Sequence, residues 1–335
     1  MIQSISLRNF GPIEDLNVDN LGRINLLIGP NRSGKTVMLK ALYCAQRAIE
    51  LTGRGKNPKS DKEILAYKLY WTFQVEKLGQ LVRKPNNGAL RFSMKESGGN
   101  VFEYSFGPET EKKIVKLEGV PNSRTSNSVF IPAKEVLSLI NVIKEYHDVK
   151  MEFGFDETYY DLAMALTPTT KGKIAKPFLH AREQLETALG GHIVYSKDKQ
   201  MWQYVQGKYT YDINMTSEGT KKIAIFDTLI GNHFLTKDSI VFIDEPESGL
   251  HPGLLVELLD IIGQLAGYGM QFFIASHSYF VIKKLYLLAN TLKMSIPVIS
   301  FDKEGKNEVS DLKASMPENP IIDQSIKLYE EELSL

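Results

Sequence analysis

The chain has 335 residues, of which 43% are apolar and 24% charged, and its 40 Lys and Arg balance 40 Asp and Glu. This is the composition of a globular protein of one to three domains, so a collagen-like rod, a coiled-coil rod and a disordered tail are excluded. The single Cys44 cannot form an internal disulfide, which excludes a secreted disulfide framework. No run of 18 apolar residues is present, and Met1 to Ser4 lack the features of a signal peptide. We therefore expect a cytoplasmic protein that does not span a membrane.

The zero net charge is the sum of unequal segments. Residues 51–130 hold 14 Lys and Arg against 8 Asp and Glu, whereas residues 302–335 hold 4 Lys against 9 Asp and Glu. Two interpretations stay open. Either both segments are ordinary solvated surfaces, or the first is an electropositive face for phosphate-bearing partners and the second an acidic C-terminal surface.

Residues 1–132 are predicted to form an N-terminal lobe. Near-alternation of apolar and polar residues predicts a strand at 2–10, and the apolar run at 24–28 predicts a buried one. From Gly34 to just before Gly53 the apolar residues recur with the period of a helix, which predicts a helix there. Alternation between 66 and 118, beginning around Phe73 and Val75, predicts antiparallel hairpins.

Helical periodicity dominates 133–190, and a hairpin is predicted at 193–195 and 202–205, so we interpret 133–205 as a helical insertion. The C-terminal lobe, 206–335, alternates helices with buried strands, which is typical of an α/β fold with parallel strands. Its predicted helices are 221–235, 252–266 and 278–291, and its predicted strands are 240–243 and 271–275.

A glycine-containing loop joins the strand at 24–28 to the next helix. Its sequence, Gly29-Pro30-Asn31-Arg32-Ser33-Gly34-Lys35-Thr36, has the G-x-x-x-x-G-K-T pattern of a phosphate-binding loop. In this pattern backbone N–H groups surround a nucleotide's phosphates, Lys35 neutralises the β and γ oxygens, and the Thr36 hydroxyl ligates Mg²⁺. We predict that these eight residues bind ATP. Arg32 either reaches the phosphates or points to solvent.

Two carboxylates end the strand predicted at 240–243. Open α/β sheets bind ligands at the carboxyl ends of their strands. Asp244 would hold Mg²⁺ through water, and Glu245 would polarise the water that attacks the γ-phosphate.

A histidine, His277, follows the strand predicted at 271–275. Such a histidine commonly has only a structural role. Its position on the next parallel strand, 33 residues after Asp244, favours a catalytic one, in which the imidazole bonds the γ-phosphate or the attacking water.

Together these motifs and the segment Met215 to Thr220 resemble the ABC-type ATPase head of the SMC/RecF/OLD class. Ser217 and Gly219 are similar to the signature sequence of that class. The resemblance implies that they bind the γ-phosphate of the ATP held by the opposite subunit. The class also has a glutamine that senses Mg²⁺ and the γ-phosphate. Gln74 and Gln80 are both candidates for this glutamine, and the alternative for each is an ordinary surface residue.

The sequence after Glu245 ends in Leu250-His251-Pro252, which resembles OLD-like ATPases, including those of the Septu and PARIS antiphage systems. The segment Ile131 to Glu135 is similar to that group as well. OLD nucleases carry a Toprim domain, but the 58 residues after His277 cannot hold one and contain no Asp-x-Asp. No HEPN spacing of Arg and His, no zinc-binding cluster and no long heptad run is present.

The leading hypothesis is therefore an ATP-driven switch, in which two or more copies enclose ATP and Mg²⁺ and control a separately encoded nuclease or toxin in antiphage defence. The alternative is a RecF-like or SMC-like ATPase that binds DNA through a basic hairpin region around Arg83, Lys84 and Arg91. A transporter subunit is disfavoured because the loop after Glu245 is not of the transporter kind. A purely structural module is disfavoured because Lys35, Thr36, Asp244 and Glu245 are all intact.

Overall fold

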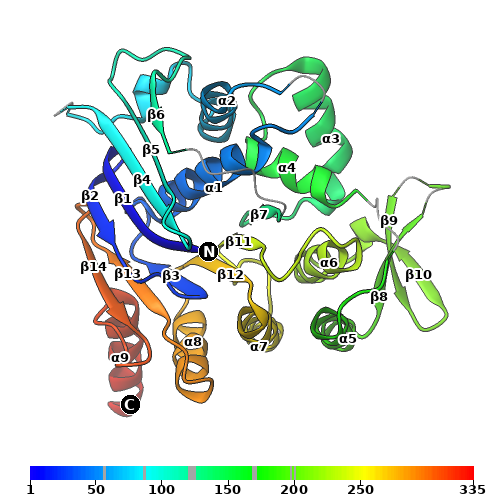
Figure 1. The fold of residues 1–335 in the computed structure, drawn as a ribbon. Coiled ribbons are helices and arrows are strands. Elements are labelled where there is room, and N and C mark those ends of the chain that lie inside the picture. Colours follow the sequence, from blue (N-terminus) through cyan, green and yellow to red (C-terminus); the bar gives the residue numbers. More distant parts are fainter. Residues whose placement is uncertain (56–57, 86–87, 120–125, 168–171, 197, 200) are drawn as a thin grey trace.

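The computed structural model describes residues 1–335 except 56–57, 86–87, 120–125, 168–171, 197 and 200. A six-stranded sheet lies at its centre (Figure 1), in the order β14-β13-β3-β12-β11-β7. All neighbours pair in parallel except the edge strand β14. The strands are β3 (Ile24–Ile28), β7 (Ser128–Ile131), β11 (Ile240–Asp244), β12 (Gln271–Ser276), β13 (Pro297–Phe301) and β14 (Asn307–Asp311). The prediction of an α/β fold with parallel strands is confirmed.

An antiparallel sheet, in the order β2-β1-β4-β5-β6, forms a second layer. Helix α1 (Lys35–Leu51) lies between the two sheets (Figure 1). One buried apolar cluster joins all three layers, because it includes Leu7 from the antiparallel sheet, Leu42 from α1 and Phe242 from the central sheet. The strands are β1 (Ile2–Phe10), β2 (Ile13–Val18), β4 (Leu90–Glu96), β5 (Val101–Phe106) and β6 (Lys116–Glu118).

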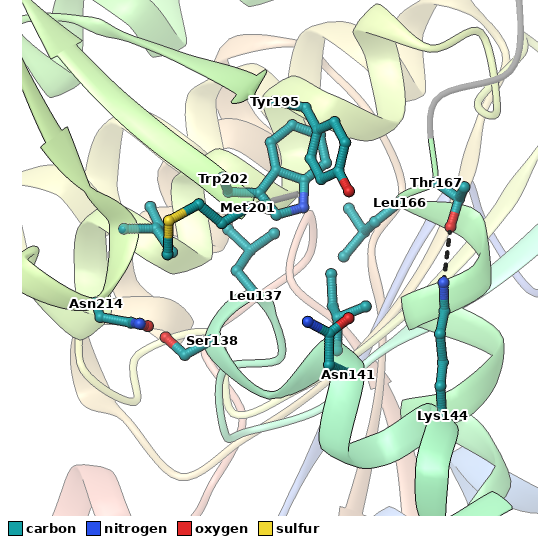
Figure 2. Close-up of a pocket in the computed structure, with 12 residues that line it drawn as sticks. Leu137, Ser138, Asn141, Lys144, Leu166, Thr167, Tyr195, Met201, Trp202 and Asn214 are labelled. Carbon is teal, nitrogen blue, oxygen red and sulfur yellow. Dashed lines mark hydrogen bonds between the residues drawn. The ribbon is translucent and has the colours of Figure 1, made fainter. Parts of the chain in front are cut away.

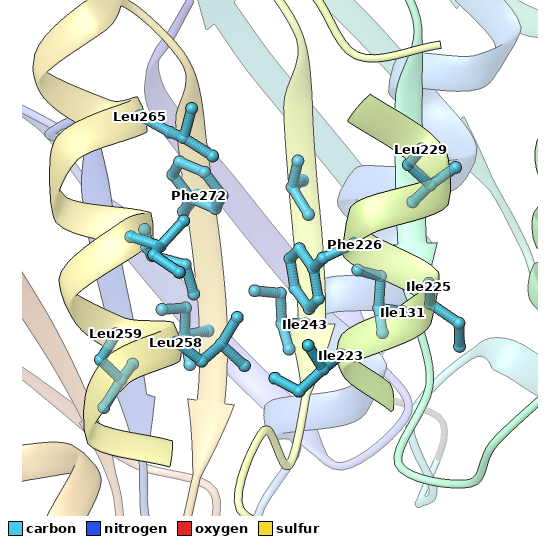
Figure 3. Packing of buried hydrophobic residues seen from close by; sticks show 14 of the residues in the cluster. Ile131, Ile223, Ile225, Phe226, Leu229, Ile243, Leu258, Leu259, Leu265 and Phe272 are labelled. Atoms are coloured by element: carbon cyan, nitrogen blue, oxygen red, sulfur yellow. The ribbon is translucent and has the colours of Figure 1, made fainter. Parts of the chain in front are cut away.

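Helices cover the other face of the central sheet. Figure 3 shows Phe226 of α6 beside Ile243 of β11, and Leu265 of α7 beside Phe272 of β12. These strands are apolar at nearly every position because both of their faces are buried, which explains their continuous apolar runs. The helices on this side are α5 (Lys176–Leu189), α6 (Glu218–Gly231), α7 (Pro252–Tyr268) and α8 (Tyr279–Thr291).

The segment predicted as a helical insertion contains α3, α4 and α5, with short 3-10 and π-helical turns around α3, followed by β8 and β9. The elements are η2 (Leu137–Leu139), α3 (Ile140–Lys144), η3 (Glu145–Lys150), α4 (Glu157–Ala165), β8 (His192–Ser196) and β9 (Met201–Gln206). A third strand, β10 (Tyr209–Asp212), completes a separate sheet in the order β10-β9-β8, and the 3-10 turn η4 (Ile213–Met215) leads from it to α6.

The structure corrects two expectations. Residues around Phe73 do not form a hairpin, because α2 (Asp61–Phe73) is a helix followed by Val75 and the 3-10 turn η1 (Leu78–Leu81). Its start is fixed by a capping box, in which the Ser60 hydroxyl accepts from the Glu63 N–H and the Glu63 carboxylate accepts from the Ser60 N–H. The helix expected at 221–235 begins earlier, at Glu218, and ends at Gly231.

The C-terminal residues form α9 (Pro320–Leu333), which the periodicity did not predict and none of whose residues is fully buried. No helix in the described part of the chain is long and apolar enough to cross a membrane.

Candidate functional site

The loop Gly29 to Thr36 connects β3 to α1, as the sequence predicts. Two of its glycines are required by the backbone. Gly29 has a φ of 144° and lies so close to β13 that a Cβ atom would stand 2.5 Å from the Phe301 carbonyl oxygen. Gly34 has a φ of 111°, and a Cβ there would stand 2.9 Å from the Ile13 side chain. Only glycine combines this backbone with this closeness.

Lys35 is buried, and its ammonium is held inside the loop. Nζ donates to the carbonyl oxygens of Gly29 at 2.7 Å and of Pro30 at 2.8 Å. Burial lowers the Lys35 pKa, and the nearby carboxylates of Asp244 and Glu245 oppose that shift. The ammonium therefore lies in the loop and in the field of the carboxylates of β11.

Asn31 and Arg32 are exposed, and Ser33 is buried. Arg32 has a φ of 66° at the tip of the loop. The Ser33 hydroxyl has no hydrogen-bond partner among the described residues. It is an unused donor within the loop.

The first turn of α1 contacts the end of β11. Thr36 Oγ1 donates to Asp244, at 3.1 Å from Oδ1 and 2.9 Å from Oδ2. Burial raises the Asp244 pKa, which means that its carboxylate lacks full compensation by nearby cations. A hydroxyl and a carboxylate are the oxygen ligands that suit Mg²⁺, which takes one or two protein ligands and substrate phosphate oxygens. The Thr36 hydroxyl and the Asp244 carboxylate leave the other positions of such an ion to phosphate oxygens, so this donor set fits a metal shared with a nucleotide.

Glu245 and His277 meet at the ends of neighbouring strands. Glu245 has a φ of 48°, and its N–H donates to the Ala275 carbonyl oxygen of β12 at 2.9 Å. His277 Nδ1 lies 3.5 Å from Glu245 Oε1. Both side chains are partly exposed, at 47% for His277 and 36% for Glu245, so solvent and ligands reach both.

Glu247, which the sequence analysis did not single out, organises this corner. Its Oε1 accepts from the Ser276 hydroxyl at 2.8 Å and from the His277 N–H at 3.0 Å. The same oxygen lies 3.6 Å from His277 Nδ1. The position of His277 therefore depends on Glu247. In the sequence, this role is indicated only by a further carboxylate two residues after Glu245.

Lys222 was also missed. It is a buried residue of α6, and Nζ donates to the carbonyl oxygens of Glu245 at 2.8 Å and Ser248 at 3.0 Å. Burial lowers the Lys222 pKa to about 8, against the attraction of Glu247 and Glu245. Through these bonds α6 holds the loop that follows β11.

Ser217 is the N-cap of α6, and its Oγ accepts from the Thr220 N–H at 3.1 Å. Gly219 packs against the same loop, because a Cβ there would stand 2.9 Å from the Gly249 carbonyl oxygen. Among the described residues neither Ser217 nor Gly219 forms a hydrogen bond or ion pair with the phosphate loop. The structure thus brings Lys35, Thr36, Asp244, Glu245 and His277 to one edge of the sheet, with Ser217 exposed elsewhere on the surface.

The two glutamines differ in environment. Gln74 ends α2 with a φ of 50°, and its Nε2 is buried with no partner in the described part of the chain. Gln80 is exposed, and its Oε1 accepts from the Glu76 N–H at 3.1 Å. Neither has a hydrogen bond with Lys35, Thr36 or Asp244 among the described residues.

The basic hairpin region is partly neutralised. Arg83 pairs with Glu14 at 3.2 Å. Arg91 of β4 lies opposite Arg8 of β1, so two arginines are neighbours across the antiparallel sheet. Glu103 and Glu118 line the same surface depression as Arg91.

Comparison with known proteins identifies related chains. A family model described as "AAA domain, putative AbiEii toxin, Type IV TA system" matches residues 52–283, more than half of the chain. The DNA replication and repair protein RecF of Streptococcus agalactiae serotype Ia is 33% identical over 97 residues, which are 29% of this chain and 24% of that protein. RecF of Bacillus cytotoxicus is 26% identical over 98 residues, also 24% of its length. The matches thus span about a quarter of these relatives.

Two solved structures share the fold over nearly the whole chain. An SMC head bound to the C-winged helix domain of ScpA superposes with a TM-score of 0.55 at 13% identity, covering 92% of this chain and 97% of that one. An SMC head with an extended coiled coil, bound to the C-terminal domain of ScpA derived from Pyrococcus furiosus, gives 0.50 at 12% identity, covering 98% of each chain. The chain therefore has the fold of an ABC ATPase head, as predicted.

Proposed function

The chain belongs to the family described as "AAA domain, putative AbiEii toxin, Type IV TA system", and from that premise we propose that it is an ATP-driven switch of the SMC/RecF class that acts on a separately encoded effector. In this proposal two copies enclose ATP and Mg²⁺, and hydrolysis separates them. The observation that carries it is the convergence of Lys35, Thr36, Asp244, Glu245 and His277 at one sheet edge.

Each residue has a role that its position supports. The backbone of Gly29 to Thr36 would hold the phosphates, and Lys35 would exchange its two loop carbonyls for phosphate oxygens. Thr36 and Asp244 would hold Mg²⁺, which when bound neutralises phosphate charge.

Glu245 is the general base of the proposal, since it is partly exposed at the end of β11. His277 lies within 3.6 Å of both Glu245 and Glu247, so it can transmit the presence of the γ-phosphate to either carboxylate. Ser217 and Gly219 would bind the γ-phosphate from the opposite copy.

The effector and the role in antiphage defence rest on the resemblance of Leu250-His251-Pro252 and of Ile131 to Glu135 to OLD-like ATPases. The SMC heads found in complex with a ScpA domain give a precedent for this fold binding a second protein. A cytoplasmic location belongs to the same proposal. Identification of a nuclease or toxin that co-purifies with the chain, and is released on hydrolysis, would support the effector.

The oligomeric state of Glu245→Gln tests the sandwich directly. This variant should keep binding ATP and stall hydrolysis, so we expect a dimer or larger assembly with ATP and Mg²⁺ and a smaller species without them, as measured by light scattering. Lys35→Ala, which removes the phosphate-binding ammonium, is the matched control and should stay small in both conditions. An identical mass for Glu245→Gln with and without ATP rejects the proposal.

A second candidate, a RecF-like DNA-binding ATPase, is favoured by the RecF match and by the adjacent arginines Arg8 and Arg91. Phosphate contacts make affinity fall steeply with salt. Binding of duplex DNA with ATP present, weakened by Arg91→Glu and by salt, would support this function. An affinity that is absent or insensitive to salt excludes it.

A further inference from the structure

A cavity of about 360 Å³ lies between α3 and the sheet that β8, β9 and β10 form (Figure 2). Its wall comes from η2 and α3, from the end of α4, from β8 and β9, and from η4. No residue of the phosphate loop, of β11 or of β12 lines it. It is therefore separate from the proposed nucleotide site, and its size is that of a small-molecule pocket.

Aromatic and aliphatic side chains form most of the wall. Trp202 is buried and Tyr195 is 37% exposed, and their ring centroids lie 5.2 Å apart at an interplanar angle of 65°. Leu137, Leu166 and Ile213 complete the apolar surface. Aromatic rings beside an open apolar space favour a planar ring system, which packs against their faces and edges.

Polar groups interrupt this surface at defined places. Ser138 Oγ is buried and has no hydrogen-bond partner within the described residues. Figure 2 shows it directed toward the Asn214 side chain, with the Asn141 amide on the same side of the cavity. Two amides and a hydroxyl provide both donors and acceptors, which suits the polar edge of a heteroaromatic ring.

Lys144, a cation among the described lining residues, lies at one end of the cavity (Figure 2). Lys144 Nζ donates to the Thr167 hydroxyl at 3.4 Å, a long bond that leaves two of its three protons for a ligand. Its stem runs along the cavity wall (Figure 2). An anionic group would bind here, because the part of the lining that the structure describes includes no Asp or Glu.

We propose that this cavity is a second ligand site, for a small molecule that joins a planar heteroaromatic ring to an acidic group and has about the size of a nucleoside monophosphate. The ring would pack on Trp202 and Tyr195, its polar edge would meet Ser138 and the two asparagine amides, and its acidic group would meet Lys144. The Ser138 hydroxyl at the cavity wall adds to this, because it is buried without a partner among the described residues, which costs free energy.

The cavity also borders the segment that presents Ser217. Ile213 and Asn214 belong to η4, and Thr216, next to Ser217, donates its hydroxyl proton to the Ile213 carbonyl oxygen at 2.7 Å. From the neighbouring turn η2, the Ser138 N–H donates to Glu135, whose carboxylate lies 3.6 Å from Lys221 of α6. A ligand would therefore contact both segments that fix the start of α6. An effect on ATP hydrolysis rests on the proposed function, whereas binding itself does not.

Fluorescence offers a direct binding assay, because the chain has only two tryptophans. In a Trp71→Phe, Lys35→Ala protein, Trp202 is the sole tryptophan and the phosphate loop is disabled. We would titrate AMP, GMP, CMP and UMP, their nucleosides, and nicotinate as a heteroaromatic acid that is not a nucleotide and has no indole fluorescence. If Lys35→Ala does not fold, the same titration in Trp71→Phe alone with saturating ADP replaces it.

We expect a saturable change with at least one nucleotide or with nicotinate, and affinity at least tenfold weaker for the nucleoside that lacks the phosphate. Lys144→Gln should weaken acid binding about tenfold, while Lys150→Gln, which alters an exposed lysine in the adjacent turn η3, should leave it unchanged. Ser138→Val should weaken binding and raise the thermal stability of the free protein, because it removes the unpartnered hydroxyl.

No saturable change with any probe, or equal affinity in the wild type and Lys144→Gln, would overturn the proposal. Binding without any change in ATP turnover in the Lys35-intact protein would reject only the coupling to α6. Absent ATP turnover together with intact binding would count against the proposed function and leave this site standing.

Discussion

At the scale of single residues, the nucleotide site depends on backbone shapes that only glycine adopts without strain. Gly29 has a φ of 144°, and a Cβ atom on it would stand 2.5 Å from the Phe301 carbonyl oxygen, whereas Gly53 has a φ of 75° with nothing within 4 Å. Comparing the same substitution at the two positions therefore separates the cost of a left-handed backbone from the cost of a steric clash.

We predict that Gly29→Ala destabilises the chain more than Gly53→Ala and abolishes ATP binding. Gly53→Ala carries only the cost of a left-handed backbone, about 1–2 kcal/mol, whereas Gly29→Ala adds a clash with β13 that must displace the loop. Chemical denaturation and calorimetric titration of ATP measure the two effects. Equal destabilisation of the two variants, with ATP binding kept in Gly29→Ala, would contradict the prediction.

Lys222 leads to a prediction of how the free energy of unfolding depends on pH. Its pKa is about 8 in the folded protein, below the ordinary value of 10.5, so the unfolded chain binds more protons between these values. Its contribution to the free energy of unfolding therefore rises with pH across this window, by at most about 1.4 kcal/mol per pH unit. The free energy of unfolding of the wild type minus that of Lys222→Met, measured by urea unfolding, should therefore be larger at pH 10 than at pH 7.5.

The exposed Lys237→Met is the control and should show no such trend. At pH 7.5, Lys222→Met should also lose the two bonds to Glu245 and Ser248, and hydrolysis should fall because the loop after β11 loses its support. A pH-independent difference between wild type and Lys222→Met would show that the ammonium is not destabilised by burial.

At the scale of elements, a buried ionic network fastens the phosphate-loop helix to the helical insertion. Lys68 of α2 contacts Glu157 and Asp161 of α4, both at 2.7 Å, and the Tyr43 hydroxyl of α1 donates to Asp161 at 2.7 Å. Burial opposes ionisation of Asp161, but Lys68 and Arg47 prevail and lower its pKa. The network is charged on both sides at neutral pH, so it joins α1, α2 and α4.

We predict that Lys68→Met costs about 3–5 kcal/mol, because it leaves two buried carboxylates without their shared cation. Lys62→Met, an exposed position on the same helix, should change stability by less than about 0.5 kcal/mol. Urea unfolding at pH 7 compares them. A loss in Lys68→Met no larger than in the control would show that the network does not stabilise the fold.

The elements also show what the sequence can and cannot predict. The phosphate loop and the strands β3, β11 and β12 were predictable, because a local motif and continuous apolar runs define them. Helix α2 was predicted wrongly, because the alternation around Phe73 and Val75 is typical of a strand. The capping box of Ser60 and Glu63 is the sequence signal that indicates a helix there. Glu247 and Lys222 were missed because their contacts join residues 23 to 30 positions apart, and no periodicity records such pairs.

At the scale of the whole molecule, the question is whether Ser217 acts on the phosphate loop of a second copy. Within one chain the hydroxyl of the exposed Ser217 bonds only Thr220 among the described residues. If the proposed sandwich forms, its two-fold symmetry makes both sites composite, each taking Lys35 from one copy and Ser217 from the other. Complementation between two inactive variants can detect this arrangement.

Lys35→Ala and Ser217→Arg should each lack ATP hydrolysis alone. In a mixed dimer one site carries both defects, but the other pairs the intact Lys35 of the Ser217→Arg copy with the intact Ser217 of the Lys35→Ala copy. A mixed dimer has one working site in two, so an equimolar mixture should recover hydrolysis, up to about half of the wild-type rate per chain when every chain pairs with the other variant. Mixing Lys35→Ala with a Lys35→Ala, Ser217→Arg double variant is the control and should recover nothing. An inactive equimolar mixture, with mixed dimers verified by differential tags, would mean that both residues serve the same nucleotide within one chain.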